Sequence, residues 1–147
     1  MKRPTRLRRA QFRFADSAQQ VVGGFLLAGP FVVTEEVWVL ASGMNAIQAV
    51  LTAGVVAAIG YATLYRADTG RDPDTEQEIA GVPVRFLSLM TVAFGSVFVL
   101  AVLFDAPDTF LIQDGVTGVE LWQTTATAVS VGAVFSVVGA ATADSVF

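Results

Sequence analysis

Four long apolar segments, separated by polar connections, dominate the chain. They run over about residues 17–40, 45–65, 84–104 and 118–141. A helix needs about 20 apolar residues to cross the hydrocarbon core of a membrane. Because a backbone in lipid must satisfy its own hydrogen bonds, we expect each segment to be helical. The pattern predicts an all-α, polytopic membrane protein, with one four-helix transmembrane domain over residues 1–147.

The composition supports this interpretation. The chain is 54% hydrophobic and 15% charged, and its mean hydropathy is +0.62. Soluble domains carry about 25% charged residues, so this chain is too apolar for an ordinary soluble surface. We therefore expect a multi-pass protein of the cell membrane, surrounded by the lipid bilayer. The preference for arginine over lysine and the acidic loops indicate a halophile-like, salt-adapted composition.

The basic residues predict the orientation of the spans. Of the nine, Arg66 and Arg71 lie in the connection between the second and third segments, and Arg85 lies at the start of the third. With four spans all nine fall on one side, so the positive-inside rule places the N- and C-termini in the cytoplasm. The other six precede the first segment: Lys2, Arg3, Arg6, Arg8, Arg9 and Arg13.

The basic segment 1–16 has three interpretations. It would lie on the inner membrane surface, attracted to anionic lipid headgroups. Alternatively, its charges only set the topology. A third alternative is that the N-terminus is a cleaved signal peptide. Pro30 and the two nearby glutamates are atypical of a signal peptide and disfavour this alternative.

Several classes of chemistry are excluded by missing residues. The chain has no cysteine and no histidine, so disulfides, thiolate or histidine metal sites and Ser–His or Cys–His nucleophiles cannot form from it alone. The acidic connection 66–78 lacks the ligand spacing of a calcium loop. No phosphate-binding glycine loop and no basic, aromatic patch for nucleic acid occurs. We expect no enzyme activity, no cofactor, no metal site and no nucleic-acid partner.

Two adjacent glutamates, Glu35 and Glu36, interrupt the first apolar segment. On a straight helix Glu35 shares a face with small and polar residues, whereas Glu36 points to the apolar side. Pro30 removes one hydrogen bond and predicts a kink that would rotate everything after it. Polar residues of the second and fourth segments fall at the same depth. The candidates for a cation or proton site are Glu35, Glu36, Thr34, Gln48, Gln123, Thr124 and Thr127.

No Lys, Arg or His is available on that side to pair with these carboxylates. A buried glutamate there would stay protonated, bind a cation or reach the membrane interface. The first two outcomes predict transport of a proton or a monovalent cation. Four helices leave no room for a wide pore, so conduction would run between subunits and transport predicts a homo-oligomer. The interfacial outcome is purely structural, and it leaves a non-catalytic membrane scaffold or partner subunit as the alternative function.

Small residues at four-residue spacing predict close helix packing. Packing inside one bundle and packing between subunits both account for them. The predicted packing positions are Gly23, Gly24, Gly54, Ala58, Gly95, Gly132 and Ser136.

The stretch GGFLLAGPFVVTEEVW, residues 23–38, resembles a family of integral membrane proteins, domain-of-unknown-function family 2391. The resemblance implies a polytopic membrane protein and brings no activity. It points to Glu36, whereas the helical periodicity favours Glu35, and both are kept as candidates. The residues that carry it are Gly23, Gly24, Pro30, Thr34, Glu36, Val37 and Trp38.

Overall fold

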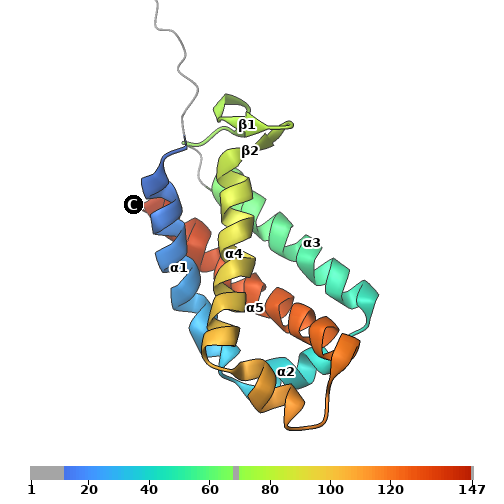
Figure 1. Ribbon diagram of the computed structural model, residues 1–147. Coiled ribbons are helices and arrows are strands. Elements are labelled where there is room, and N and C mark those ends of the chain that lie inside the picture. The colour runs from blue at the N-terminus through green and yellow to red at the C-terminus, as the bar shows by residue number, and fades with distance from the viewer. Residues whose placement is uncertain (1–11, 68–69, 147) are drawn as a thin grey trace, which may run out of the picture.

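The computed structural model describes residues 12–67 and 70–146, and these residues are almost wholly helical (Figure 1). Their α-helices are α1 (Phe14–Val32), α2 (Glu35–Ser42), α3 (Ala46–Ala62), α4 (Val84–Leu103) and α5 (Gly118–Val146). The shorter elements are the π-helical turns η1 (Thr63–Ala67) and η3 (Asp108–Ile112), the 3₁₀ turn η2 (Pro73–Thr75), and the strands β1 (Glu78–Ile79) and β2 (Val82–Pro83), which pair antiparallel. The all-α expectation is confirmed, apart from this small hairpin.

Helices are found at all four expected segments, but the first segment is broken into two helices. In the described part of the chain, three helical stretches are long and apolar enough to cross a membrane: Ala46–Ala67, Val84–Leu103 and Gly118–Val146. They correspond to the expected second, third and fourth segments. α1 and α2 pass the same test only as a pair bent by 79°. The expected first segment, kinked at Pro30, is therefore two helices with a break after Val32, and the helices able to span a membrane number three in the described residues, or four if the bent pair is one span.

The break after α1 is stabilised by hydrogen bonds to the carbonyl groups that the helix end leaves free. Thr34 has extended backbone geometry, and its hydroxyl donates to the Phe31 carbonyl at 2.8 Å. The Trp38 indole N–H donates to the Val32 carbonyl at 3.0 Å. Pro30 lies inside α1, so the predicted kink at Pro30 is replaced by a break after Val32.

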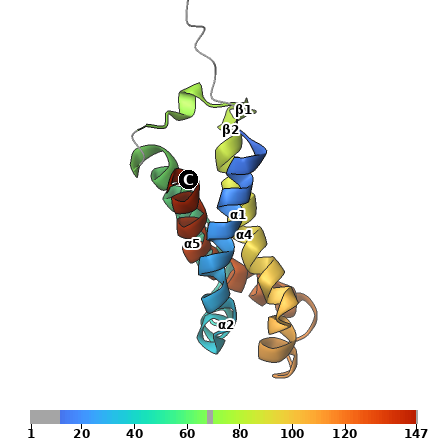
Figure 2. The same ribbon diagram turned by 90° about the vertical axis from the view of Figure 1, so that its left-hand side faces the viewer.

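α5 is the central helix, because it contacts α1, α2, α3 and α4. Figure 2 shows α1, α4 and α5 running beside one another, with α2 at the far end of the bundle. Small side chains on α5 let these neighbours approach closely. The small residues of α5 that are buried are Ala128, Gly132, Ala133, Ser136, Ala140 and Ala141.

The crossing of α1 and α5 depends on glycine. A Cβ at Gly23 would overlap the carbonyl oxygen of Gly139, and a Cβ at Gly139 would overlap that of Gly23. Next to this contact, the Ser136 hydroxyl donates to the Gly24 carbonyl at 3.1 Å and lies 2.9 Å from the Ser96 hydroxyl of α4. Gly23, Gly24 and Ser136 therefore join three helices, as the packing prediction requires.

The other predicted packing positions divide into two groups. A Cβ at Gly132 would lie 2.7 Å from Val97 Cγ1, so Gly132 is needed for the contact of α5 with α4. A Cβ at Gly54 or Gly95 would meet no atom within 4 Å, and Ala58 is exposed on α3. These three residues therefore make no close helix contact within the described residues, where Gly95 is half-buried beside α5 and the other two are exposed. Packing against a second subunit stays a prediction.

We expect Gly132→Leu to lower the stability of the bundle and Gly54→Leu to leave it unchanged. The added side chain meets Val97 in the first variant, and overpacking a core costs about 1–3 kcal/mol. It meets open space in the second. Thermal unfolding of the purified variants in the same detergent tests this. Equal destabilisation of both variants would show that the α4–α5 contact is not packed as described.

Candidate functional site

Polar side chains gather at the two ends of the bundle. One group surrounds Arg85, where α1 begins, the hairpin lies and α5 ends (Figures 1 and 2). The other surrounds a pocket between α3 and the start of α5. Glu120 and Asp144, one from each group, are 24 residues apart on α5, which corresponds to about 36 Å of helix.

Arg85 is the centre of the first group. It lies in the first turn of α4, and its guanidinium reaches carboxylates from three other parts of the chain. Nε donates to Glu76 Oε1 at 2.9 Å, and Nη2 donates to Asp16 Oδ2 at 3.2 Å. Nη1 donates to Asp144 Oδ1, near the end of α5. The Asp144 side chain is 0% exposed and that of Glu76 is 5% exposed.

Further donors complete this group, and we call Asp16, Arg71, Glu76, Arg85 and Asp144 together the Arg85 cluster. Arg71 places Nε 3.6 Å from Glu76 Oε1 and Nη1 3.8 Å from Asp144 Oδ2. The buried Gln20 of α1 donates to Asp144 Oδ2 at 3.0 Å, and Tyr65 of η1 donates to Glu76 Oε2 at 2.6 Å. Every buried side-chain nitrogen and oxygen atom in the described residues has a hydrogen-bond partner.

The Arg85 cluster holds the ends of the helices together. Charged groups are costly to bury, and removing one partner of a buried pair leaves the other charge uncompensated, at a cost of about 3–5 kcal/mol. Here α1, α4, α5 and the segment after α3 each contribute a charged residue, so displacing any of them would unpair a buried charge.

The sequence reasoning missed this cluster. Arg85 was interpreted only as a topology signal, and the fourth expected segment ended at 141, before Asp144. The available signal was one polar residue in the first apolar segment, Gln20, and one just beyond the fourth, Asp144, since polar residues at such positions normally pair with partners inside the protein.

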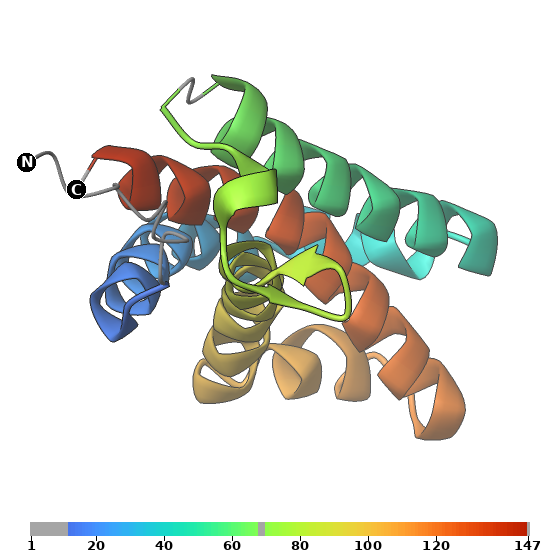
Figure 3. The ribbon, with the colours of Figure 1, turned by 90° about the horizontal axis from the view of Figure 1, so that it is seen from above.

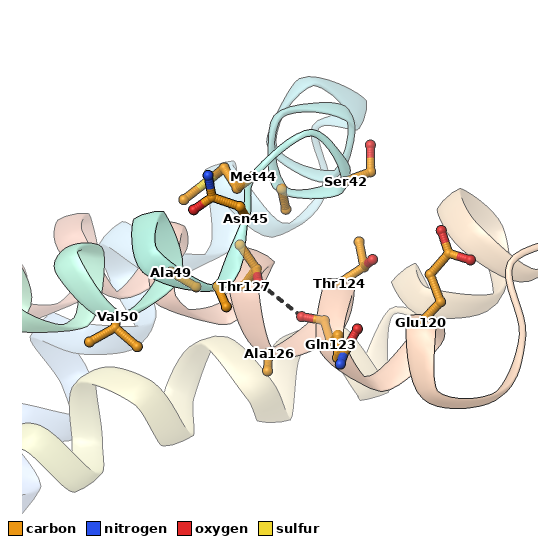
Figure 4. A pocket seen from close by; sticks show the side chains of 12 residues that line it. Ser42, Met44, Asn45, Ala49, Val50, Glu120, Gln123, Thr124, Ala126 and Thr127 are labelled. Atoms are coloured by element: carbon orange, nitrogen blue, oxygen red, sulfur yellow. Dashed lines mark hydrogen bonds between the residues drawn. The ribbon is translucent and has the colours of Figure 1, made fainter.

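The second group lines what we call the α3–α5 pocket, a cavity of about 680 Å³. Figure 4 shows its side chains coming from the end of α2, the start of α3 and the first turns of α5. Of the predicted candidates, Gln123, Thr124 and Thr127 meet here. The lining residues are Ala41, Ser42, Met44, Asn45, Ala46, Ala49, Val50, Glu120, Gln123, Thr124, Ala126 and Thr127.

The pocket offers oxygen atoms and one carboxylate. The Thr127 hydroxyl donates to the Gln123 carbonyl at 2.9 Å, so its oxygen lone pairs remain available (Figure 4). Thr124 is largely buried, and its side chain lines the pocket (Figure 4). Asn45 Oδ1 accepts from the Gln48 backbone N–H and caps α3. The exposed Glu120 forms no ion pair with the described residues.

The remaining candidates lie elsewhere. Glu35 and Glu36 are both exposed in the first turn of α2, where they line a separate hollow with Val39 and Leu40. The expectation that Glu35 faces the protein is therefore wrong, because the 79° bend ends the helical periodicity on which it depended. Gln48 caps α3, and Thr34 stabilises the break after α1.

The residues that form the pocket come from two stretches of the sequence that are negatively charged. Neither 14–65 nor 86–147 contains a Lys or Arg, whereas both ranges contain carboxylates. The pocket is built from these two ranges, so its surroundings attract cations.

We expect Arg85→Gln to destabilise the bundle by about 3–5 kcal/mol, because it leaves Asp144 buried without its main cationic partner. Arg66→Gln is the matched control, since it removes the same charge from an exposed position at the same end. Equilibrium unfolding of both variants in mixed micelles measures the difference. Similar stability of the two variants would contradict the structural role of the Arg85 cluster.

Comparison of the chain with models of protein families gives no match, and comparisons with curated proteins and with solved structures give none either. The resemblance of residues 23–38 to a family of unknown function therefore stays a prediction. The function must be argued from the site alone.

Proposed function

We propose that the chain is a multi-pass protein of the cell membrane, with four spans and both termini in the cytoplasm. In this arrangement the bent pair α1–α2 is the first span. The basic residues Arg66, Arg71 and Arg85 belong to the same end of the bundle as the start of α1 and the end of α5 (Figure 1). Under the positive-inside rule this end faces the cytoplasm. The α3–α5 pocket then opens toward the outside.

We further propose that the protein takes up a proton or a monovalent cation from the outside through the α3–α5 pocket. The observation that supports this is the lining: the carboxylate of Glu120 and the hydroxyls of Thr124 and Thr127, with no basic residue. Hard cations prefer oxygen ligands of this kind. Glu120 thus replaces Glu35 and Glu36 as the charged residue of the proposed site.

The two ends of the bundle differ in a way that suits uptake from one side. The pocket is open and presents carboxylate and hydroxyl oxygens, whereas the Arg85 cluster occupies the opposite end. Between Thr127 and Asp144, the buried face of α5 carries small or apolar residues, with Ser136 as its one hydroxyl. Under this proposal a cation would enter the pocket in the described conformation without passing across the bundle. Passage would need a conformational change or a path between subunits of the expected homo-oligomer.

We expect Na⁺ or K⁺ to raise the thermal stability of the protein more than choline does at the same ionic strength. A cation that binds only the folded state at 100 times its Kd stabilises by about 2.7 kcal/mol. Glu120→Gln should abolish the difference between cations. Glu36→Gln, which removes an exposed carboxylate outside the pocket, should preserve it.

Flux into liposomes provides the functional readout. Wild-type protein and Glu36→Gln should carry a proton or monovalent-cation flux that Glu120→Gln lacks. If no gradient of Na⁺, K⁺ or protons drives a flux through correctly folded wild-type protein, the transport proposal fails. The non-catalytic scaffold or partner subunit then becomes the better account.

A further inference from the structure

A second hollow, which we call the α4–α5 groove, adjoins the α3–α5 pocket on α5. Figure 3 shows α5 passing between α3 and α4, which diverge from the hairpin end of the bundle in Figure 1. The groove has a volume of about 440 Å³. The exposed Ala126 lines both hollows, so the pocket and the groove meet at this small residue.

The α4–α5 groove presents mainly apolar surface. Phe94 and Phe98 of α4 and Trp122 of α5 line it. Two hydroxyls also line it, those of Thr125 and Ser130, and they donate to carbonyl groups of α5 at 2.7 Å and 3.0 Å. Trp122 is 67% exposed and Phe98 is 44% exposed. The apolar part of a ligand can therefore reach the aromatic side chains of the groove from the surface of the bundle.

The α3–α5 pocket is large enough for an organic ammonium ion. Its volume of about 680 Å³ lies in the range of about 300–1,000 Å³ that is usual for sites of small organic ligands. An ammonium group donates hydrogen bonds and accepts none. The pocket offers acceptors for it in the carboxylate of Glu120 and the side-chain oxygens of Gln123 and Thr127.

The two hollows follow one another along α5 in the order of the parts of a membrane amphiphile. Glu120 lies in the first turn of α5, and the groove extends from Trp122 to Ser130, about 12 Å of helix. In the proposed topology α5 begins at the outer surface, so Glu120 lies near the interface and the groove lies deeper in the bilayer. A lipid of the outer leaflet has the same order of polar head and apolar chain.

We propose that the pocket and the groove together bind an amphiphilic organic cation. Its ammonium head lies in the α3–α5 pocket beside Glu120, and its apolar chain crosses Ala126 into the α4–α5 groove. Charge complementarity favours a cationic head, because the ranges 14–65 and 86–147 contain carboxylates and no Lys or Arg. The inference rests on the proposed cation site and names the class of cation that the site takes.

Quenching of tryptophan fluorescence by a brominated alkyl chain tests where the ligand lies. The protein has two tryptophans: Trp122 lines the groove, whereas Trp38 is 2% exposed. The probe is a primary alkylammonium ion with a dibrominated chain, added to the protein in uncharged micelles. The neutral control is the alcohol with the same dibrominated chain. The ammonium ion should quench more strongly than the alcohol, and Trp122→Phe should lose this excess quenching.

Four variants separate the contribution of the head from that of the chain. Gly95→Leu fills the groove, because a Cβ at this position meets no atom within 4 Å, and Ala126→Phe blocks the junction of groove and pocket. Both should lose the excess quenching. Ala58→Phe adds the same bulk at an exposed position outside both hollows and should retain it. Glu120→Gln should weaken binding of the ammonium ion about two- to fivefold, the effect of losing one exposed ion pair.

Thermal unfolding identifies the variants that are folded, and the result is read from those. Equal quenching by the ammonium ion and the alcohol in the wild-type protein would overturn the inference. Excess quenching that persists in a folded Gly95→Leu or Ala126→Phe variant, or unchanged binding in Glu120→Gln, would overturn it too. If Na⁺ or K⁺ still stabilises the protein through Glu120 in that case, the proposed function stands and only this inference fails. Binding as proposed without ion flux would refute transport and leave the binding site standing.

Discussion

The bundle depends on one constraint, which is that the guanidinium of Arg85 is buried where four parts of the chain meet. Such a charge is tolerated only with carboxylates in contact, and Asp16, Glu76 and Asp144 supply them. Asp16 belongs to α1, Glu76 to the segment that follows η2, and Asp144 to α5. Pairing the charge of Arg85 with these carboxylates therefore fixes where each of these elements meets α4. Glycine and serine contacts deeper in the bundle, at Gly23 and Ser136, then set how closely the helices pack.

The same arrangement makes the two ends of the molecule unlike. At the Arg85 cluster, polar groups are fully paired, so this end is closed. At the α3–α5 pocket, hydroxyl oxygens and the carboxylate of Glu120 are open to a ligand, and no basic residue is near in the sequence. This difference between the two ends is the basis on which we propose that a cation is taken up at one of them.

Hydropathy predicted the helices because it reports transfer into lipid, a property of each segment alone. The third expected segment, 84–104, differs from α4 by one residue. The bend after α1 was not predictable, because it depends on Trp38 meeting the Val32 carbonyl after the chain has turned. The pocket was predicted in part, since Thr124 and Thr127 follow helical spacing. The Arg85 cluster was not, because Arg85 and Asp144 are 59 residues apart and only the fold brings them together.

The most direct test of this account is a double-mutant cycle on Arg85 and Asp144. Unfolding free energies would be measured for Arg85→Gln, for Asp144→Asn and for the double variant in one micelle system. Each single variant leaves one member of this buried ion pair without the other, whereas the double variant removes both charges. The account predicts that the double variant loses less stability than the sum of the single losses, by about 0.5–3 kcal/mol. Strict additivity would contradict the claim that this ion pair organises the bundle.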